Sequence, residues 1–159
     1  MDLLPITLSM NWKHNGKEIT EFNHFPKGTF GFVYKTTHIP SGKAYIGKKV
    51  LVHNKKVKVT KKDLLMYEGV KGRKPTHKRV SKESDWKTYY GSNKLLMELV
   101  KKEPPKNFER YIIKLAPNKK LLTYYEAQYQ FMYQVLEHPD QYFNDNILGK
   151  FYTKDLASH

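Results

Sequence analysis

Cysteine is absent from the 159-residue sequence, and acidic side chains are scarce. The lack of cysteine fits a protein of a reducing compartment. No apolar run reaches the length that a membrane span needs. The first residues lack both the basic start and the long apolar stretch of a signal peptide. These absences favour a soluble cytoplasmic protein, and the chain length favours one domain with its own core.

Positive charge, by contrast, is in large excess. Lysine and arginine total 29 against 15 acids, which gives a formal net charge of +14 and a pI of about 9.7. Such an excess destabilises a compact domain by self-repulsion and usually reflects an anionic partner. The alternative is a basic surface that serves solubility alone. We expect nucleic acid as the partner and duplex DNA first, although basic and aromatic residues also serve RNA.

Residues 27–50, KGTFGFVYKTTHIPSGKAYIGKKV, contain what looks like the glycine-rich loop of a protein kinase. A kinase also needs His-Arg-Asp and Asp-Phe-Gly motifs, and neither occurs in the chain. The first glycine of such a loop would fall on Pro26, and the chain is too short for two lobes. The segment is better interpreted as an antiparallel hairpin. Its strands, 29–39 and 44–52, are rich in β-forming residues, and a Pro-Ser-Gly-Lys turn joins them.

The remaining segments predict a small α+β domain. Asn15-Gly16 is a strong turn signal for a further N-terminal hairpin within residues 11–25. Other segments predict a short aromatic strand around residues 84–92, a helix capped by Ser92, a strand over 108–116 and a helix over 119–138. We therefore expect a small antiparallel three-stranded central sheet flanked by helices, with an extra N-terminal hairpin.

We expect this to be a single domain over residues 1–159, with an N-terminal extension at 1–27 and a basic insertion at 51–84. The insertion holds eleven Lys/Arg and three acids, so it contributes +8 to the net charge. A solvated charge run is the ordinary interpretation of such a segment. Its density of cations equally suits phosphate contacts. The nucleic-acid-binding residues that we predict are Lys49, Lys55, Lys56, Lys58, Arg73, Lys74, Lys78, Arg79 and Trp86.

Two tyrosines of the central hairpin are candidates for chemistry. Strand parity allows Tyr34 and Tyr45 to place both rings on one face, although a tyrosine pair on a hairpin more often serves packing. Phe32-Val33-Tyr34 is followed, after ten residues, by Tyr45-Ile46-Gly47. This pattern resembles the signature of the GIY-YIG nucleases. Phe32 stands where that signature has a glycine.

Three later motifs resemble the phage branch of the family, which includes free-standing homing-type endonucleases. They are WKTYYGS at 86–92, Asn-Phe-Glu-Arg at 107–110 and Tyr-Tyr-Glu at 124–126. The similarity runs from residue 30 to about residue 147. It implies a metal-dependent DNA endonuclease in which a hairpin tyrosine helps to generate or orient the attacking water. It also implies one Mg²⁺ or Mn²⁺ ion held by a glutamate, which the motif places at Glu126.

The helical pattern singles out Glu126 independently. This carboxylate falls at the margin of the apolar stripe formed by Leu122, Tyr125, Tyr129, Met132 and Leu136. A carboxylate at such a position is costly unless it meets a cation or hydrogen-bond donors. An ordinary half-exposed glutamate is the alternative by pattern alone.

The resemblance also implies further catalytic roles. The resemblance implies an asparagine near the C-terminal end, for which Asn144 is the better match and Asn146 the alternative. The family's helix arginine is missing, since Lys55 occupies that position. We take Arg110 as the catalytic cation, with Lys48 and Lys94 as substitutes. A nucleic-acid-binding protein with a decayed nuclease site is the alternative function.

Overall fold

Residues 10–156 are described by the computed structural model, and they divide into two units. Residues 10–51 together with 85–156 form the first unit, and Val52–Ser84 forms the second. The expected extension at 1–27 is described only from residue 10 onward. None of the helices in the described part of the chain is long and apolar enough to cross a membrane.

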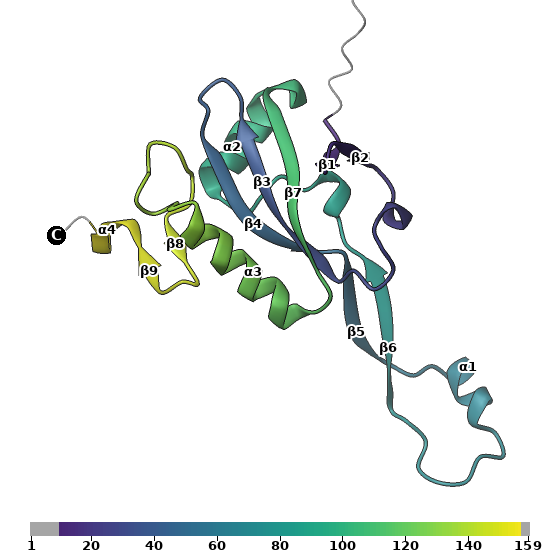
Figure 1. Ribbon diagram of the computed structural model, residues 1–159. Helices are drawn as coiled ribbons and strands as arrows, with labels where there is room; N and C mark the ends of the chain where they lie inside the picture. Colours follow the sequence, from purple (N-terminus) through teal and green to yellow (C-terminus); the bar gives the residue numbers. More distant parts are fainter. Residues whose placement is uncertain (1–9, 157–159) are drawn as a thin grey trace, which may run out of the picture. The chain divides into compact units, whose positions relative to one another are not determined.

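A five-stranded sheet organises the described residues of the first unit (Figure 1). Its order is β2-β1-β7-β3-β4. The strands are β1 (Trp12–His14), β2 (Lys17–Ile19), β3 (Gly31–His38), β4 (Ala44–Val50) and β7 (Phe108–Ala116). The predicted α+β class is confirmed, with β7, β3 and β4 as the three antiparallel central strands. The predicted N-terminal hairpin joins the same sheet, because β1 pairs parallel with β7.

The N-terminal hairpin turns at Asn15-Gly16, as the sequence predicts. Both residues have positive φ, 51° and 79°, which is the conformation that a two-residue turn between twisted strands requires. Trp12 and Ile19 lie opposite each other in this hairpin and are both buried. The hairpin therefore adds apolar side chains to the core as well as two strands to the sheet.

Two helices pack on the sheet, and both begin at asparagine caps. In α2 (Lys94–Lys102) the side chain of Asn93 accepts a hydrogen bond from the Leu96 N–H, so Ser92 is not the cap that we expected. In α3 (Lys119–Met132) Asn118 caps Leu121 in the same way. The segment before α2 is the 3₁₀ turn η3 (Trp86–Thr88) rather than a strand.

The helix α3 is shorter than the prediction of 119–138. It ends at Met132, and Gln134 adopts a positive φ of 53° that reverses the chain. The reversal carries Val135 and Leu136 into the core, where both are buried. Met132, which the predicted stripe placed inside, is 61% exposed. Tertiary packing of Val135 and Leu136 thus replaces the last turns of the expected helix.

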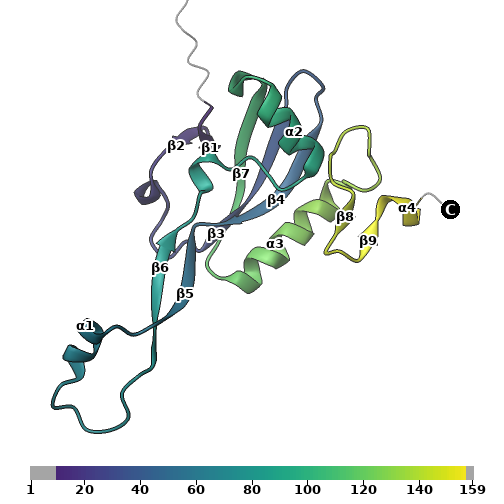
Figure 2. The same ribbon diagram turned by 180° about the vertical axis from the view of Figure 1, so that it is seen from behind.

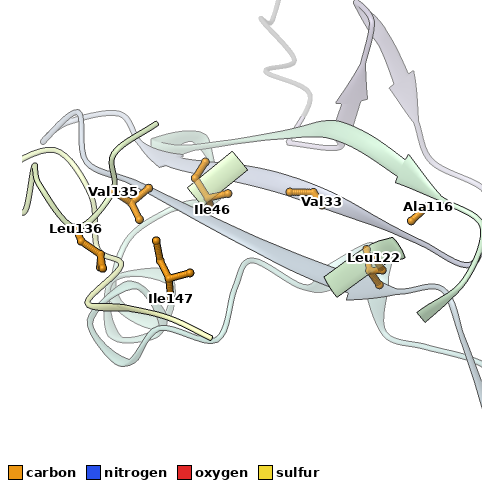
Figure 3. Close-up of a cluster of buried hydrophobic side chains, with 7 residues drawn as sticks. All are labelled: Val33, Ile46, Ala116, Leu122, Val135, Leu136 and Ile147. Carbon is orange, nitrogen blue, oxygen red and sulfur yellow. The ribbon is translucent and has the colours of Figure 1, made fainter. Parts of the chain in front are cut away.

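One face of the sheet packs against α3 through a compact aliphatic cluster (Figure 3). Its buried members are Val33, Ile46, Ala116, Leu122, Val135, Leu136 and Ile147. On the opposite face, aromatic rings of Trp12, Phe25, Phe32, Tyr34 and Trp86 contact one another. The hairpin β3–β4 is therefore held between two cores, which fixes the position of its side chains.

The C-terminal segment returns alongside α3 and β4 (Figure 2). It contains β8 (Asn146–Ile147), β9 (Phe151–Tyr152) and the short α4 (Thr153–Leu156). Two further 3₁₀ turns, η1 (Phe22–His24) and η4 (Pro105–Asn107), connect elements of this unit.

The second unit is a two-stranded antiparallel ribbon of β5 (Val52–Lys58) and β6 (His77–Glu83). The loop that joins the two strands contains α1 (Lys61–Leu64) and η2 (Leu65–Tyr67) (Figure 1). Every residue of β6 is exposed. The basic insertion is thus a hairpin with regular strand pairing.

Candidate active site

A polar cleft of about 360 Å³ lies beside β4, at the edge of the five-stranded sheet. Four of the predicted catalytic residues line it together, namely Tyr45, Lys94, Glu126 and Asn144. They come from β4, the start of α2, α3 and the segment before β8. The other lining residues are Ser92, Asn93, Gln130, Asp145, Asn146, Leu148 and Gly149.

The two hairpin tyrosines share one face, which confirms the prediction from strand parity. Tyr34 pairs with Gly47 and Thr36 pairs with Tyr45 in the β3–β4 register, so the two tyrosines are diagonal neighbours. Their ring centroids are 6.2 Å apart. The two hydroxyls differ in environment, because the Tyr45 hydroxyl hydrogen-bonds Ser92 Oγ at 2.9 Å beside the cleft. Tyr34 is fully buried, and its hydroxyl lies near the Tyr89 phenol but makes no hydrogen bond of good geometry within residues 10–156.

Burial reinforces the protonated state of both phenols. It raises the pKa of Tyr34 well above its ordinary value, and the neighbouring phenols of Tyr89 and Tyr45 raise it further. Burial also raises the pKa of Tyr45, although the hydrogen bond with Ser92 acts in the opposite direction. At neutral pH both side chains are therefore protonated phenols, which donate hydrogen bonds rather than accept protons.

Gly47 makes room for this tyrosine pair. A Cβ atom at position 47 would lie 2.6 Å from Tyr34 Oη and 2.7 Å from Tyr45 Cε2. Any side chain there would displace one of the two rings. The glycine after Tyr45-Ile46 is thus a packing requirement of the site.

Glu126 projects from α3 into the cleft with its side chain 17% exposed. Burial raises the pKa of this carboxyl, and Lys48 lowers it, with Lys48 Nζ 3.8 Å from Glu126 Oε1. Lys48 also donates a hydrogen bond to Thr123 Oγ1 at 2.9 Å. The predicted glutamate and one predicted cation are thus brought together by α3 and β4.

The cleft offers oxygen ligands to a cation. Glu126 and Asp145 supply carboxylates, and Gln130, Asn144 and Asn146 supply side-chain amides to its lining. No cluster of three His, Cys, Asp or Glu side chains with metal-site geometry occurs within residues 10–156. A metal held here would keep water in most coordination positions, as Mg²⁺ usually does in proteins.

Asn144 binds the backbone of β4 with its side-chain amide. The Ile46 N–H donates to Asn144 Oδ1 at 3.0 Å, and Asn144 Nδ2 donates to the Ile46 carbonyl at 2.8 Å. Gln130 Nε2 donates to the same carbonyl at 2.9 Å. Because β4 is an edge strand, these amides complete its backbone hydrogen bonds where a further strand would otherwise pair.

Arg110 lies elsewhere, contrary to the role that we expected. Its guanidinium donates to the carbonyl oxygens of Lys87, Tyr89 and Met10 at 2.7–2.9 Å, and it stacks on aromatic rings in the core. The side chain is only 5% exposed, and burial lowers its pKa to about 10. Arg110 does not line the cleft. Its contacts tie the N-terminal hairpin and the η3 segment to β7.

Trp86 also differs from the expectation of base stacking. It is fully buried against Phe25, and its carbonyl accepts a hydrogen bond from Trp12 Nε1 at 2.7 Å. Lys49 pairs with Asp85 and lies 3.9 Å from the centroid of the Tyr89 ring. The remaining predicted nucleic-acid contacts are all exposed cations of the second unit, namely Lys55, Lys56, Lys58, Arg73, Lys74, Lys78 and Arg79.

Sequence reasoning did not assign Gln130, Ser92 or Asp145 to the site. Gln130 is 5% exposed on α3, four residues after Glu126. This spacing places the two side chains on the same helix face and is the signal that could have identified it. Ser92 and Asp145 have no such pattern, because their positions depend on how the segments before α2 and β8 return to β4.

Comparison with known families identifies the domain. A family model described as "Putative endonuclease segE, GIY-YIG domain" matches residues 12–147. The chain therefore belongs to this GIY-YIG endonuclease family, and the resemblance drawn from the sequence motifs is confirmed. No curated protein and no solved structure matches the chain. Membership supports a nuclease function, for which nucleic acid is the substrate.

Proposed function

We propose that the protein is a metal-dependent DNA endonuclease that hydrolyses phosphodiester bonds at the cleft beside β4. The observation that carries the proposal is the convergence of Tyr45, Lys94 and Glu126 on one polar cleft in a GIY-YIG chain. A phenol, a cation and a carboxylate are the group types that this hydrolysis needs around a phosphate.

Glu126 is the metal ligand in this proposal, and Mg²⁺ or Mn²⁺ is the ion. Its carboxylate and the amide and carboxylate oxygens around it form a hard-oxygen donor set, which suits both ions. A divalent cation bound there would neutralise phosphate charge and assist departure of the leaving oxygen. It would also compensate the burial that raises the pKa of Glu126.

Tyr45 is the phenol that reaches the substrate. Its hydroxyl lies at the cleft with Ser92, and as a protonated phenol it donates a hydrogen bond that orients the attacked phosphate or the attacking water. The Tyr34 ring packs behind Tyr45 and holds it in place. We propose Tyr34 as a positioning residue.

Lysines replace the missing arginine. Lys48 lies beside Glu126, and Lys94 lines the cleft at the first turn of α2. Either ammonium group can stabilise charge on the phosphate as it develops in the transition state. Asn144 acts through β4, because its amide fixes the backbone next to Tyr45.

The exposed cations of the second unit hold the DNA backbone. Seven of the predicted contacts lie there, and none of these side chains is buried. Their ammonium and guanidinium groups provide the counterion-releasing contacts that dominate DNA affinity.

A non-catalytic nucleic-acid-binding protein is the second candidate. It is favoured by one observation, that no arginine lines the cleft while Arg110 is engaged in the core. Supercoiled plasmid incubated with Mg²⁺, Mn²⁺ or EDTA separates the two functions. We expect nicking or linearisation with either metal and none in EDTA. Salt-sensitive plasmid binding without cleavage in any metal would overturn the nuclease and leave the second candidate.

A further inference from the structure

The loop between β5 and β6 presents apolar side chains to solvent. Leu65 is 65% exposed, Met66 82% and Val70 57%, and Tyr67 beside them is also exposed. Apolar side chains clustered in one exposed loop commonly mark a binding surface. These residues belong neither to the cleft nor to a core cluster of the described chain.

Residues 65–70 form the tip of the ribbon, and the loop holds this tip in a defined conformation. Thr60 and Asp63 form a reciprocal capping box at the start of α1. Asp63 also pairs with Lys78 of β6 at 2.7 Å, and these hydrogen bonds lower the pKa of Asp63 to about 2. Leu64 is half-buried and lines a hollow with Val59 and Pro75. Because Leu64 turns toward the ribbon and the next two residues turn outward, Leu65 and Met66 protrude from an anchored turn.

The charges around the tip favour an anionic ligand. Within residues 59–76 there are five cations (Lys61, Lys62, Lys71, Arg73 and Lys74) and two acids. One of those acids, Asp63, is already paired with Lys78. An apolar wedge surrounded by cations is complementary to a base-pair step between two phosphate backbones.

The ribbon behind the tip brings two cations face to face. Lys56 lies directly opposite Arg79 in the register. Like charges facing each other across strands are destabilising, and an isolated two-stranded ribbon is marginal in water. Phosphates along both sides of a DNA groove would neutralise this pair, and β-ribbon proteins bind in the minor as well as the major groove.

We propose that the β5–β6 ribbon follows a groove of duplex DNA and that Leu65 and Met66 enter a base-pair step as a wedge, which unstacks the step and bends the duplex. The proposal rests on the proposed function in one respect, because it takes duplex DNA as the ligand. Wedges of this kind enter from the minor groove and combine apolar insertion with cationic backbone contacts.

Insertion between base pairs unwinds the duplex, and a linking-number assay measures unwinding without knowledge of a target sequence. Relaxed closed-circular plasmid is incubated in EDTA with the full-length protein and a metal-independent type IB topoisomerase, then deproteinised. We expect the wild-type protein to lower the linking number. The double variant Leu65→Ala/Met66→Ala should lose most of that shift while it still binds plasmid. Met132→Ala is the matched control, because Met132 is an exposed methionine in the first unit, and it should behave as wild type.

Three results would overturn the wedge. They are the absence of a linking-number shift with the wild-type protein, an undiminished shift with the double variant, and a loss of plasmid binding that parallels the loss of the shift. Nicking in Mg²⁺ is scored separately, so a protein that unwinds plasmid in EDTA but never cleaves it would refute the proposed nuclease and leave the wedge standing.

Discussion

Glu126 combines an unfavourable environment with a position in the cleft. Its carboxyl is mostly buried on α3, burial raises its pKa, and Lys48 only partly offsets the cost. A group that costs stability and lines a polar cleft is typical of a functional site. The same reasoning separates Tyr45 from Tyr34, because only the Tyr45 hydroxyl has a partner beside the cleft.

The raised pKa of Glu126 predicts a pH-dependent stability difference. The folded protein binds this proton more tightly than the unfolded chain, so the stability cost is absent at pH values below the unfolded pKa and complete above the folded pKa. In EDTA at pH 7, Glu126→Gln should therefore raise the free energy of unfolding, and the gain should vanish toward pH 4. Urea unfolding at both pH values measures it. A variant less stable than wild type at pH 7 would contradict the assignment.

The two tyrosines should respond differently to loss of the hydroxyl. Tyr45→Phe removes a donor at the cleft and should slow plasmid nicking about 100-fold, the magnitude usual for one such donor. Tyr34→Phe removes a hydroxyl without a hydrogen-bond partner, so the free energy of unfolding should change by no more than about 1 kcal/mol. Its nicking rate should fall less than that of Tyr45→Phe. Single-turnover rates in Mg²⁺ test the order, and a larger loss in Tyr34→Phe would reverse the proposed roles.

Among the elements, β4 owes its position to side chains as much as to strand pairing. β3 binds one of its edges, and the amides of Asn144 and Gln130 bind the other at Ile46. This arrangement keeps Tyr45 at the cleft, since Tyr45 precedes the residue that is bound.

Removal of the Asn144 amide should loosen that edge. Asn144→Ala leaves the buried Ile46 N–H without its acceptor, which typically costs about 1–3 kcal/mol. We expect thermal unfolding at a lower temperature and slower nicking, with unchanged plasmid affinity. Asn146→Ala is the control for stability alone, because the Asn146 side chain bonds its neighbours Asp145 and Gly149 and not β4. Equal stability of the two variants would contradict the role of Asn144 in holding β4.

Local sequence patterns correctly predicted the elements that depend on interactions between residues close together in the chain. The Asn15-Gly16 turn, the β3–β4 hairpin and β7 follow from turn chemistry and β-forming runs. The C-terminal part of the predicted 119–138 helix failed because burial of Val135 and Leu136 outweighs helix continuation. Trp86 and Arg110 were misjudged for a related reason. An aromatic or cationic residue in sequence does not reveal whether its partners are bases, phosphates or the protein core.

Across the whole molecule, charge is divided unevenly between the two units. Residues 51–84 contribute +8 of the net +14, and they lie almost entirely in the second unit. The first unit carries the cleft. Binding and hydrolysis are therefore expected to respond to different substitutions.

Salt dependence distinguishes the two units. Lys56→Gln/Arg79→Gln removes two proposed phosphate contacts, so the slope of log K against log salt should become shallower by about 1.8 for duplex DNA. Lys101→Gln/Lys102→Gln removes two exposed cations of α2 and is the charge-matched control. Fluorescence anisotropy on a short duplex from low to moderate salt measures the slope. Identical slopes for both variants would mean that the ribbon acts only through net charge.

The most direct test of the nuclease is plasmid cleavage by Glu126→Gln, measured beside wild type and Glu98→Gln. Glu98 is an exposed glutamate of α2 and serves as the matched control. Loss of a metal ligand removes several kcal/mol of transition-state stabilisation, so the Mg²⁺-dependent nicking rate should fall by a factor of about 100 or more. Wild type and Glu98→Gln should nick at the same rate. Nicking by Glu126→Gln at the wild-type rate would contradict the assignment of Glu126 as the metal ligand.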